Sequence, residues 1–512
     1  MSRRVRRQAS RSRKFPIIIV VTTLFLLACI FCWAVYQAAQ RDIHGENTVT
    51  LEIAYSPEKQ ALFEELVKRF NAGRPQIPSG KRITVVATAM EPEAMIGAAL
   101  AGRFQALCPD SSIWLTQLDL DWQAQQGSEA SIIGETTRFA VSPVVIAMWE
   151  DTARALGYPD KAIGWADLLQ AARTNSNFKW SHPATSSASG LLATLATFYA
   201  GANKTRGLTI EDVTAESTIA YVTALEKTVR YYGEGELAVI QQVAEKGRAY
   251  LDAFVVQEQL LIQFNQKHKD KLVAIYPVEG AMWADHPLAF LERPEATAEQ
   301  RLAYRSFRDF LLSSDTQALV LAYGYRPTDL SIALDSPTSP IKPENGVDPT
   351  QPKTTLQIPG PAVIEVVQDV WQYTKRKTNV YLVADVSGSM QGEKLEQAKE
   401  AFLAFLDSIK GDQERVGLIV FSSDVYETIP LAELASNRQV LRSTIAGLSA
   451  GGDTSLLDAI YMAYDKLQQR QDRERINAIV VMTDGKENDS EISLRELTNR
   501  LRQGNESGLP VV

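Results

Sequence analysis

Cysteine and histidine are scarce in this 512-residue chain, and their positions exclude several kinds of site. Two of the three cysteines, Cys29 and Cys32, lie in an apolar run near the N-terminus. Cys108 is therefore alone in the rest of the chain, and no disulfide can form within that part. The four histidines are widely separated in the sequence and do not suggest a metal or catalytic cluster.

Signature motifs of several enzyme classes and a surplus of positive charge are also missing. The chain contains no Gly-x-x-x-x-Gly-Lys-Ser/Thr, no His-Glu-x-x-His and no Gly-x-Ser-x-Gly. The formal net charge is −8, and seven of the 53 basic residues lie in the first fourteen positions, which leaves 46 against 61 acidic residues. Because phosphate contacts need clustered Lys and Arg, this acidic body argues against nucleic acid as a partner. We expect a binding protein rather than an enzyme.

The longest uncharged hydrophobic run covers residues 16–36. As a helix it reaches roughly 30 Å, enough to cross the hydrocarbon core of a bilayer. The basic segment 1–14 predicts a cytoplasmic N-terminus, so we expect a single-pass cell-membrane anchor with an extracytoplasmic body. Two alternative interpretations also place the rest of the chain outside the cytoplasm. One is a cleaved signal peptide, and the other is a lipoprotein in which Leu26-Leu27-Ala28-Cys29 makes Cys29 the lipid-bearing residue.

Residues 46–335 alternate strand and helix patterns, which predicts an α/β region with mainly parallel sheet. Residues 48–55 have the alternation of a strand, and Ser56-Pro57 opens a helix that continues to Phe70. A second strand over 81–87 and a helix over 91–101 follow. Because the region is longer than one doubly wound unit needs, we expect two lobes.

Several short segments of this region resemble the extracellular solute-binding proteins that serve bacterial transporters. Residues 137–149 look like the first strand that crosses between the lobes, and residues 276–287 look like the return crossing. Residues 156–168 resemble the start of the second lobe, and residues 317–327 the terminal helix and its exit. Such proteins close two lobes over a ligand. Their ligands include sugars, oxyanions, metals, polyamines and peptides, so the resemblance leaves the solute open; a scaffold that has lost ligand binding is the alternative.

Six side chains are candidates for the lining of a cleft that would bind a small polar or anionic solute. Hydroxyls and free amides at a predicted helix start, after His182-Pro183, suit such a ligand. Two further serines could face them from the first lobe, and an aromatic and an acidic residue of the return crossing could line the cleft. The alternative is that the serines are ordinary helix caps and the other two pack the hinge. The candidates are Ser56, Ser111, Ser187, Ser189, Trp283 and Asp285.

Residues 336–360 contain six prolines among mostly polar residues and show no periodic pattern of apolar residues. This composition predicts an extended connector that is semi-rigid where prolines cluster. Residues 363–373 then have the spacing of a short amphipathic helix.

The segment from residue 378 to 512 places acids at the ends of two apolar strands. Residues 379–384 are followed by Asp385, Ser387 and Ser389, and residues 476–482 are followed by Asp484. Between them, Gly451-Gly452-Asp453-Thr454 presents a hydroxyl just before a helix. Because the carboxyl ends of parallel strands share one edge, we expect these oxygen atoms to converge. Such hard oxygen donors suit an ion such as magnesium.

The order Asp-x-Ser-x-Ser, Thr, Asp resembles the metal-ion-dependent adhesion site of von Willebrand factor A domains. The resemblance implies a Rossmann-like fold, C-terminally incomplete because the chain stops where the next central strand should begin. It implies Mg²⁺, or another divalent cation such as Ca²⁺ or Mn²⁺, completed by a carboxylate of a protein partner. The implied ligands are Ser387, Ser389 and Thr454, directly or through water, with Asp385 and Asp484 setting the charge. The alternative is a nucleotide-type fold with incidental helix caps.

These patterns together predict a membrane-anchored extracytoplasmic binding protein that captures a protein partner through a divalent-metal site. The alternative is a solute receptor of a bacterial transporter, with the A domain as an accessory.

Overall fold

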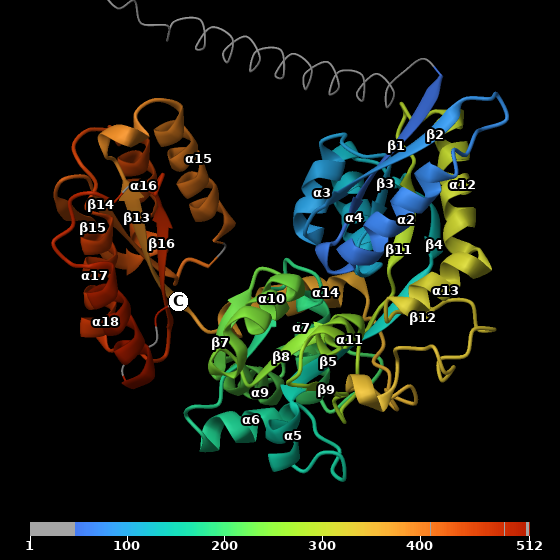
Figure 1. The fold of residues 1–512 in the computed structure, drawn as a ribbon, viewed down its shortest axis with the longest axis horizontal. Helices are drawn as coiled ribbons and strands as arrows, with labels where there is room; N and C mark the ends of the chain where they lie inside the picture. Colours follow the sequence, from blue (N-terminus) through green and yellow to red (C-terminus); the bar gives the residue numbers. More distant parts are fainter. Residues whose placement is uncertain (1–46, 410, 486, 508–510, 512) are drawn as a thin grey trace, which may run out of the picture.

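The structure, a computed structural model, describes residues 47–409, 411–485, 487–507 and 511. It contains two lobes, built mainly from residues 48–327, and a C-terminal domain from residue 378 onward (Figure 1). None of the helices within the described ranges is long and apolar enough to cross a bilayer, and the predicted span at 16–36 lies outside those ranges.

Lobe one is a five-stranded sheet in the order β2-β1-β3-β11-β4, with helices packed against it. Strand β1 pairs parallel with β2 and β3, whereas β11 runs antiparallel to both of its neighbours. Its elements are β1 (Thr48–Tyr55), η1 (Pro57–Lys59), α2 (Gln60–Ala72), β2 (Arg82–Ala89), α3 (Pro92–Leu100), β3 (Ala106–Cys108), α4 (Ile113–Gln126), β4 (Ile133–Arg138), β11 (Pro287–Leu291), α12 (Ala298–Leu312) and α13 (Ser314–Ala322).

Lobe two is a seven-stranded sheet with the path β10-β5-β8-β6-β7, to which β9 and β12 add by pairing with β5. Its strands are β5 (Ala140–Trp149), β6 (Trp180–Pro183), β7 (Val229–Gly233), β8 (Ala253–Gln257), β9 (Leu272–Ile275), β10 (Trp283–Ala284) and β12 (Arg326–Pro327). Its helices are α5 (Glu150–Ala155), α6 (Trp165–Thr174), α7 (Gly190–Gly201), α8 (Ile210–Thr214), α9 (Glu216–Glu226), α10 (Glu236–Lys246), η2 (Gly247–Ala249) and α11 (Glu258–Lys267).

Both sheets are mixed, so the prediction of mainly parallel sheet is wrong for this region. The chain crosses from lobe one to lobe two between β4 and β5 and returns between β10 and β11. The strands that follow the two crossings, β5 and β11, run antiparallel to their neighbours in the sheets that they join. Strand β5 pairs antiparallel with β8, β9, β10 and β12, and β11 with β3 and β4. The prediction of two lobes agrees with the structure.

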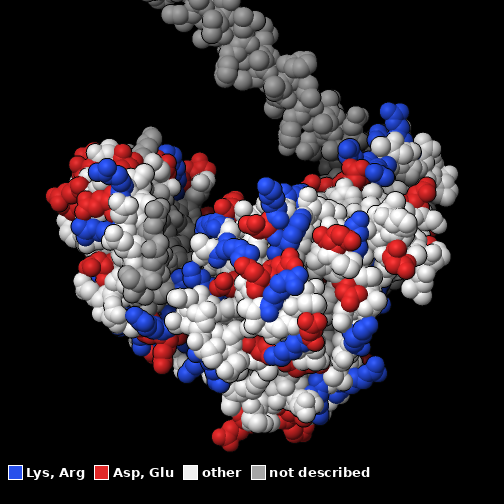
Figure 2. Space-filling view, turned by 60° about the horizontal axis from the view of Figure 1, so that its bottom comes forward, with Lys and Arg blue, Asp and Glu red and all other residues white. Residues whose placement is uncertain are grey.

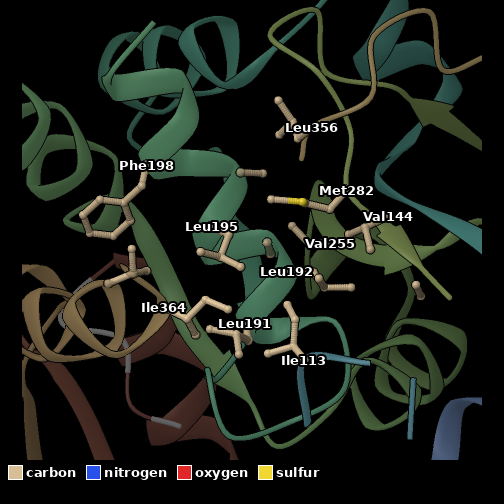
Figure 3. Close-up of a cluster of buried hydrophobic side chains, with 14 of the residues drawn as sticks. Ile113, Val144, Leu191, Leu192, Leu195, Phe198, Val255, Met282, Leu356 and Ile364 are labelled. Atoms are coloured by element: carbon tan, nitrogen blue, oxygen red, sulfur yellow. The ribbon is translucent and has the colours of Figure 1, made fainter. Parts of the chain in front are cut away.

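Helix α7 lies at the centre of the largest hydrophobic core (Figure 3). Ten of its twelve residues are buried, which is why its sequence is apolar on all sides instead of along one stripe. Leu191, Leu195 and Phe198 pack there with Leu356 and Ile364, which come from beyond the two lobes. The helix starts at Gly190, where a Cβ atom would lie 1.8 Å from the carbonyl oxygen of Ala184.

The proline-rich segment lies along lobe two as a strap, here defined as residues 336–360. The amide of Leu356 donates to the carbonyl of Ala281, and the amide of Ala281 donates to that of Thr354, both at 3.0 Å. Helix α14 (Pro361–Thr374) follows, after the short η3 (Pro343–Asn345) within the strap. Val367 and Trp371 of α14 are buried in the core around α7. The strap therefore folds against the lobe with turns and a short 3₁₀ helix, instead of forming the extended connector that its prolines predict.

The C-terminal domain is a four-stranded sheet in the order β15-β14-β13-β16 between helices. Strand β13 is central and buried along most of its length, as its apolar sequence predicts. Helices α15 and α16 contribute to the core on one face and α17 to the core on the other. Its elements are β13 (Thr378–Asp385), η4 (Gly388–Met390), α15 (Glu393–Ser408), β14 (Arg415–Phe421), β15 (Val425–Glu433), α16 (Leu434–Ala446), α17 (Leu456–Arg470), β16 (Ile476–Met482) and α18 (Leu494–Ser507). Beyond α18, Val511 forms a parallel bridge to Asn477.

Arg376 joins the C-terminal domain to lobe two. Its backbone N–H donates to the hydroxyl of Tyr232 at 2.7 Å, and its guanidinium donates to the carbonyl of Val229 at 2.8 Å. The same guanidinium donates to the carbonyls of Arg473 and Glu474, at 2.6 and 3.2 Å, just before β16. One side chain therefore bonds to both sides of the junction.

Candidate metal site and interlobe cleft

The ends of β13 and β16 bring two carboxylates to one edge of the C-terminal sheet. The strands are parallel and pair in register up to Ala384 and Met482, so Asp385 and the Thr483-Asp484 pair come next on adjacent strands. Asp385 is buried, and its Oδ1 accepts the Ser387 amide at 2.8 Å. Its Oδ2 accepts the hydroxyl of Thr483 at 2.6 Å. Asp385 is thereby fixed in orientation from both strands.

The two loop serines extend this arrangement to the second acid. The hydroxyl oxygens of Ser387 and Ser389 lie 3.0 Å apart, and Ser389 Oγ donates to Asp484 Oδ1 at 3.1 Å. Four of the five predicted metal residues are thus connected through hydrogen bonds within the site. They come from two strand ends that are about 95 residues apart in sequence.

The loop that carries Thr454 lies against the serine loop. The Gly388 amide donates to the carbonyl of Gly452 at 2.9 Å, and the Gly451 amide donates to that of Val386 at 2.7 Å. Gly452 has φ +88°, and a Cβ there would lie 2.9 Å from Ser423 Oγ, so the turn requires glycine. Thr454 is buried beside this contact. The structure therefore brings the three loops of the predicted site together.

Lys394 is a residue of this site that the sequence reasoning missed. Its ammonium donates to Asp484 Oδ2 at 2.7 Å and to the Ser389 carbonyl at 3.2 Å. It lies in the first turn of α15, where a positive charge is unfavourable to the helix dipole. A lysine at that position is a weak signal of a nearby acid, because a solvated lysine there would look the same in the sequence.

The donors at this edge fit a hard divalent cation. Two carboxylates and several hydroxyls, all oxygen, converge within hydrogen-bonding distance of one another. Among the described residues no group of three or more His, Cys, Asp and Glu side chains is arranged to hold a metal, so any ion at this edge depends on the hydroxyls. Ser387, Ser389 and Thr454, with Asp385 and Asp484, would hold it.

The four predicted cleft serines are buried between or beside the lobes. Ser56 Oγ donates to Glu58 and accepts from the Lys59 ammonium, at 3.0 and 2.6 Å. In lobe two, Ser187 Oγ donates to the Ala184 carbonyl at 2.7 Å. Ser189 Oγ donates to Glu236 at 2.9 Å, and Ser111 Oγ accepts the Ile113 amide at 3.3 Å. Their hydroxyls are bonded to protein groups.

Trp283 and Asp285 lie at the return crossing. The indole N–H of Trp283 donates to Thr355 of the strap at 3.2 Å. Asp285 accepts the Ser112 amide at 2.7 Å and pairs with Arg138 at 3.0 Å, so it caps α4 and ties it to the first crossing. Both side chains contact structural elements of the hinge.

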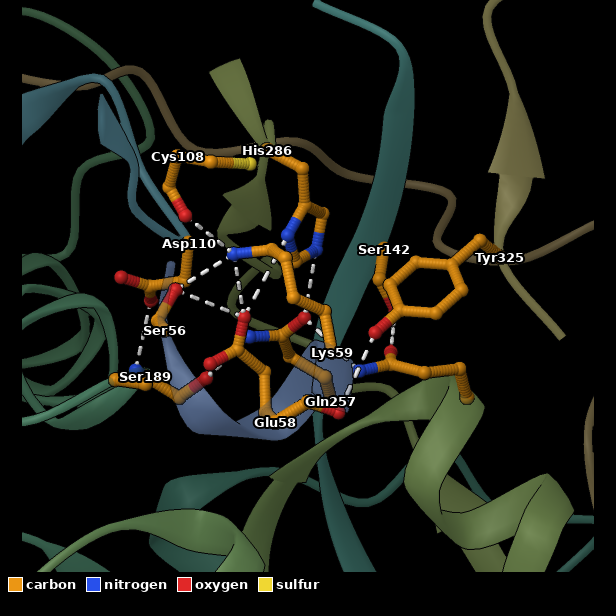
Figure 4. Close-up of polar contacts among 12 residues, drawn as sticks. Ser56, Glu58, Lys59, Cys108, Asp110, Ser142, Ser189, Gln257, His286 and Tyr325 are labelled. Atoms are coloured by element: carbon orange, nitrogen blue, oxygen red, sulfur yellow. Dashed lines mark hydrogen bonds and ion pairs between the residues drawn. The ribbon is translucent and has the colours of Figure 1, made fainter. Parts of the chain in front are cut away.

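Charged residues that the sequence reasoning did not single out fill the cleft (Figure 4). Glu58, Lys59, Asp110, Glu236 and His286 are all buried. The Lys59 ammonium lies 2.9 Å from both Glu58 Oε1 and the carbonyl oxygen of Cys108. Burial lowers the pKa of His286 well below its ordinary value, so its ring is neutral there. Only the fold reveals this cluster, because its members are spread over more than 200 residues.

Comparison with known proteins confirms both resemblances. The family model of bacterial extracellular solute-binding proteins matches residues 51–326, more than half of the chain, and that of the von Willebrand factor type A domain matches residues 379–508. Inter-alpha-trypsin inhibitor heavy chain H4 from Homo sapiens is 34% identical over 137 residues, 25% of this chain and 15% of that protein. The Bos taurus protein of the same name is 36% identical over 114 residues, 21% and 12%. The chain thus spans about a seventh of the length of these relatives.

Solved structures similar to this chain are periplasmic binding proteins. The sulfate-binding protein SubI from Mycobacterium tuberculosis has a TM-score of 0.41 at 16% identity, covering 57% of this chain and 90% of its own. The ferric binding protein from Campylobacter jejuni has a TM-score of 0.44 at 14% identity, covering 63% and 98%. The chain belongs to the family of bacterial extracellular solute-binding proteins and carries a von Willebrand factor type A domain after its solute-binding domain.

Proposed function

We propose that the protein is a membrane-anchored, extracytoplasmic binding protein that captures a protein partner through a metal ion held by its A domain. The ion would be held by the metal edge, here defined as Asp385, Ser387, Ser389, Thr454 and Asp484. The observation that carries this proposal is the hydrogen-bonded series from Asp385 through Ser387 and Ser389 to Asp484 at the end of two parallel strands. Its oxygen atoms are positioned by three loops that bond to one another. On the face shown in Figure 2, Lys and Arg side chains are interspersed with Asp and Glu side chains. This face therefore has no purely basic patch that would bind a polyanion.

The charge of the site favours an acidic partner. Ser387, Ser389 and Thr454 are neutral ligands, so only Asp385 and Asp484 offset the charge of a divalent cation such as Mg²⁺, Ca²⁺ or Mn²⁺. When bound, the ion supplies a position that attracts a carboxylate of the partner. The Asp484 side chain is 11% exposed, and the neighbouring Lys394 and Asp453 are exposed, so this edge lies at the surface of the domain.

The membrane anchor is supported by the uncharged run at 16–36 and the basic residues before it. The expected result is that the protein stays in the membrane fraction during alkaline carbonate extraction and that its body is accessible to protease from outside. Cys29→Ser distinguishes the lipoprotein alternative: loss of membrane association in that variant would show a lipid anchor instead of a spanning helix.

The test of the main proposal begins with calorimetric titration of Mg²⁺ into wild-type protein and the Asp385→Ala variant. Partners are then crosslinked in native membranes with Mg²⁺ or with chelator. We expect a partner that is captured with Mg²⁺ and lost with chelator or Asp385→Ala, and retained by Asp453→Ala, which removes an exposed carboxylate from the same edge. Capture that is insensitive to chelator and to Asp385→Ala would contradict the proposal.

A cavity at the mouth of the cleft supports the second candidate function, a solute receptor. Its volume is about 840 Å³, and it lies between α3, α4, residues 185–186 and α14. Its lining includes the acids Glu93, Asp121, Glu365 and Asp369 beside Trp114, which favours a cationic solute. A saturable rise in melting temperature with a polyamine, reduced in Glu365→Gln/Asp369→Asn, would favour this function. Sulfate and neutral sugars serve as controls.

A further inference from the structure

The two residues just before α7, Ala188 and Ser189, offer their backbone amides to lobe one, and both amides are bound by carboxyl groups. The Ala188 amide donates to Glu91 Oε2 at 2.9 Å. The Ser189 amide donates to Asp110 Oδ2 at 2.8 Å. Ser189 adopts φ +61°, an uncommon conformation for a residue with a side chain, which aims successive amides at the cleft. The turn that would hold an anionic solute therefore holds two acids of the opposite lobe.

Each acid is closely fitted to its place. Asp110 is fully buried, and its other oxygen accepts the indole N–H of Trp114 at 3.0 Å. Glu91 also lies against the residue before α10: a Cβ added at Gly235 would lie 2.3 Å from Glu91 Oε1. Glu91 therefore lies where the N-terminal ends of α7 and α10 meet, which favours a carboxyl group at both helix dipoles.

The remaining contacts across the cleft are also made by the chain itself. His286 Nε2 lies 2.8 Å from Gln257 Oε1, which joins the return crossing to the end of β8. In lobe two, Gln257 also donates to Ser189 Oγ and to Glu236, at 3.0 and 2.7 Å. Gln257, Glu236 and His286 are fully buried, and Figure 4 shows Gln257 beside His286. Helix α14 contacts α4 of lobe one as well as α7 and α9 of lobe two, so it spans the mouth of the cleft.

We infer that the interlobe cleft is occupied by tethered internal ligands, the carboxyl groups of Asp110 and Glu91, which close the two lobes in the absence of any solute. These groups bond to the amides just before α7 as the carboxyl of a free ligand would. The domain is then a closed scaffold, and its latent site fits a small carboxylate. The inference does not depend on the metal edge, which is in another domain.

The first test replaces the internal ligand with a free one. We expect Asp110→Ala in the full chain to lower the melting temperature of the two-lobed region by about 5 °C, because the Ser189 amide loses a buried acceptor. Acetate or formate should restore about half of that loss in a saturable way, relative to chloride at equal ionic strength. Asp121→Ala, which removes an acid of the cleft mouth, should show neither effect. Wild-type protein that is stabilised saturably by acetate, or a folded Asp110→Ala that is not rescued, would overturn the inference.

A second measurement uses an intact cleft and does not depend on whether Asp110→Ala folds. Spin labels at the exposed positions Gln125 on α4 and Glu245 on α10 report the separation of the lobes, with Cys29 and Cys32 replaced by serine. We expect one narrow distance distribution that acetate, sulfate and spermidine leave unchanged. A broad or long distribution that one of these solutes narrows would show an open receptor and overturn the inference. Metal removal should leave the distribution unchanged, so failure here is distinguishable from failure at the metal edge.

Discussion

The ammonium nitrogen of Lys394 lies 2.7 Å from Oδ2 of Asp484, one of the two carboxylates of the metal edge. The chain thus provides its own cation to an acid that a divalent ion would use. The lysine side chain is 53% exposed and can move into solvent, so its competition with a metal is modest.

Lys394→Met should tighten Mg²⁺ binding by about two- to five-fold. The substitution removes a positive charge that competes with the metal for Asp484, and an exposed ion pair of this kind contributes no more than about 1 kcal/mol. Calorimetric titration at low salt measures the change, which should shrink as the salt concentration rises. Lys399→Met is the matched control, because Lys399 is on the same helix and pairs with Glu396 instead. Equal affinities for the two variants would show that Lys394 does not compete.

Thr483→Val should weaken metal binding by on the order of 10- to 100-fold although Thr483 is not one of the predicted ligands. Its hydroxyl donates to Asp385 Oδ2 at 2.6 Å and fixes the orientation of that carboxylate. Thr483→Ser retains the hydroxyl and should bind close to wild type. If the serine variant were as weak as the valine variant, loss of packing instead of loss of orientation would be the cause.

Leu356→Ala should destabilise the two-lobed region by about 2–5 kcal/mol, because the strap buries this side chain in the core of lobe two. Thermal unfolding of the full chain measures the effect. Ile358→Ala, two residues later and 36% exposed, is the control and should cost far less. Equal small effects would indicate that the strap is not part of the folding unit.

The stability of the two-lobed region should fall as the pH rises from about 5 to 8. Burial and then the charge of Glu58 raise the pKa of Asp110 to about 7, and burial raises the pKa of Glu91 to about 8. In the unfolded chain both acids lose their protons near pH 4, so the folded state retains protons that the unfolded state has released. The stabilisation is therefore complete below about pH 4 and is lost as the pH rises through 7 and 8.

Calorimetry across this pH range checks the expectation, with Glu91→Gln as the diagnostic variant. Its melting temperature should change less with pH above about 7, since the group that titrates there is gone. A wild-type melting temperature that rises steadily between pH 5 and 8 would contradict the assignment.

The convergence of the acids and hydroxyls at the ends of β13 and β16 was predictable because its signals are local. Asp385 and Asp484 each end an apolar run, and the parallel pairing of such runs puts their ends together. Lys394 was not predicted, since a lysine near a helix start is also a common solvated charge. The cleft was harder still. Ser187 and Ser189 were recognised as a helix start, but the acids that meet their turn come from lobe one, 79 to 97 residues earlier. The local sequence around Asp110 and Glu91 does not predict which backbone amides these side chains contact.

The hydrogen bonds of Arg376 have a mechanical consequence for the proposed function. Under the proposed function, a partner held at the metal edge would pull on the carboxyl end of β13, seven residues after the start of that strand. The pull then reaches a guanidinium that is bonded to Val229 in lobe two and to the carbonyls before β16. Load would therefore reach lobe two through these hydrogen bonds before it stretches the strap, which lies on the far side of α14. Tension from a bound partner would therefore rotate the C-terminal domain about its hydrogen-bonded junction with lobe two at Arg376.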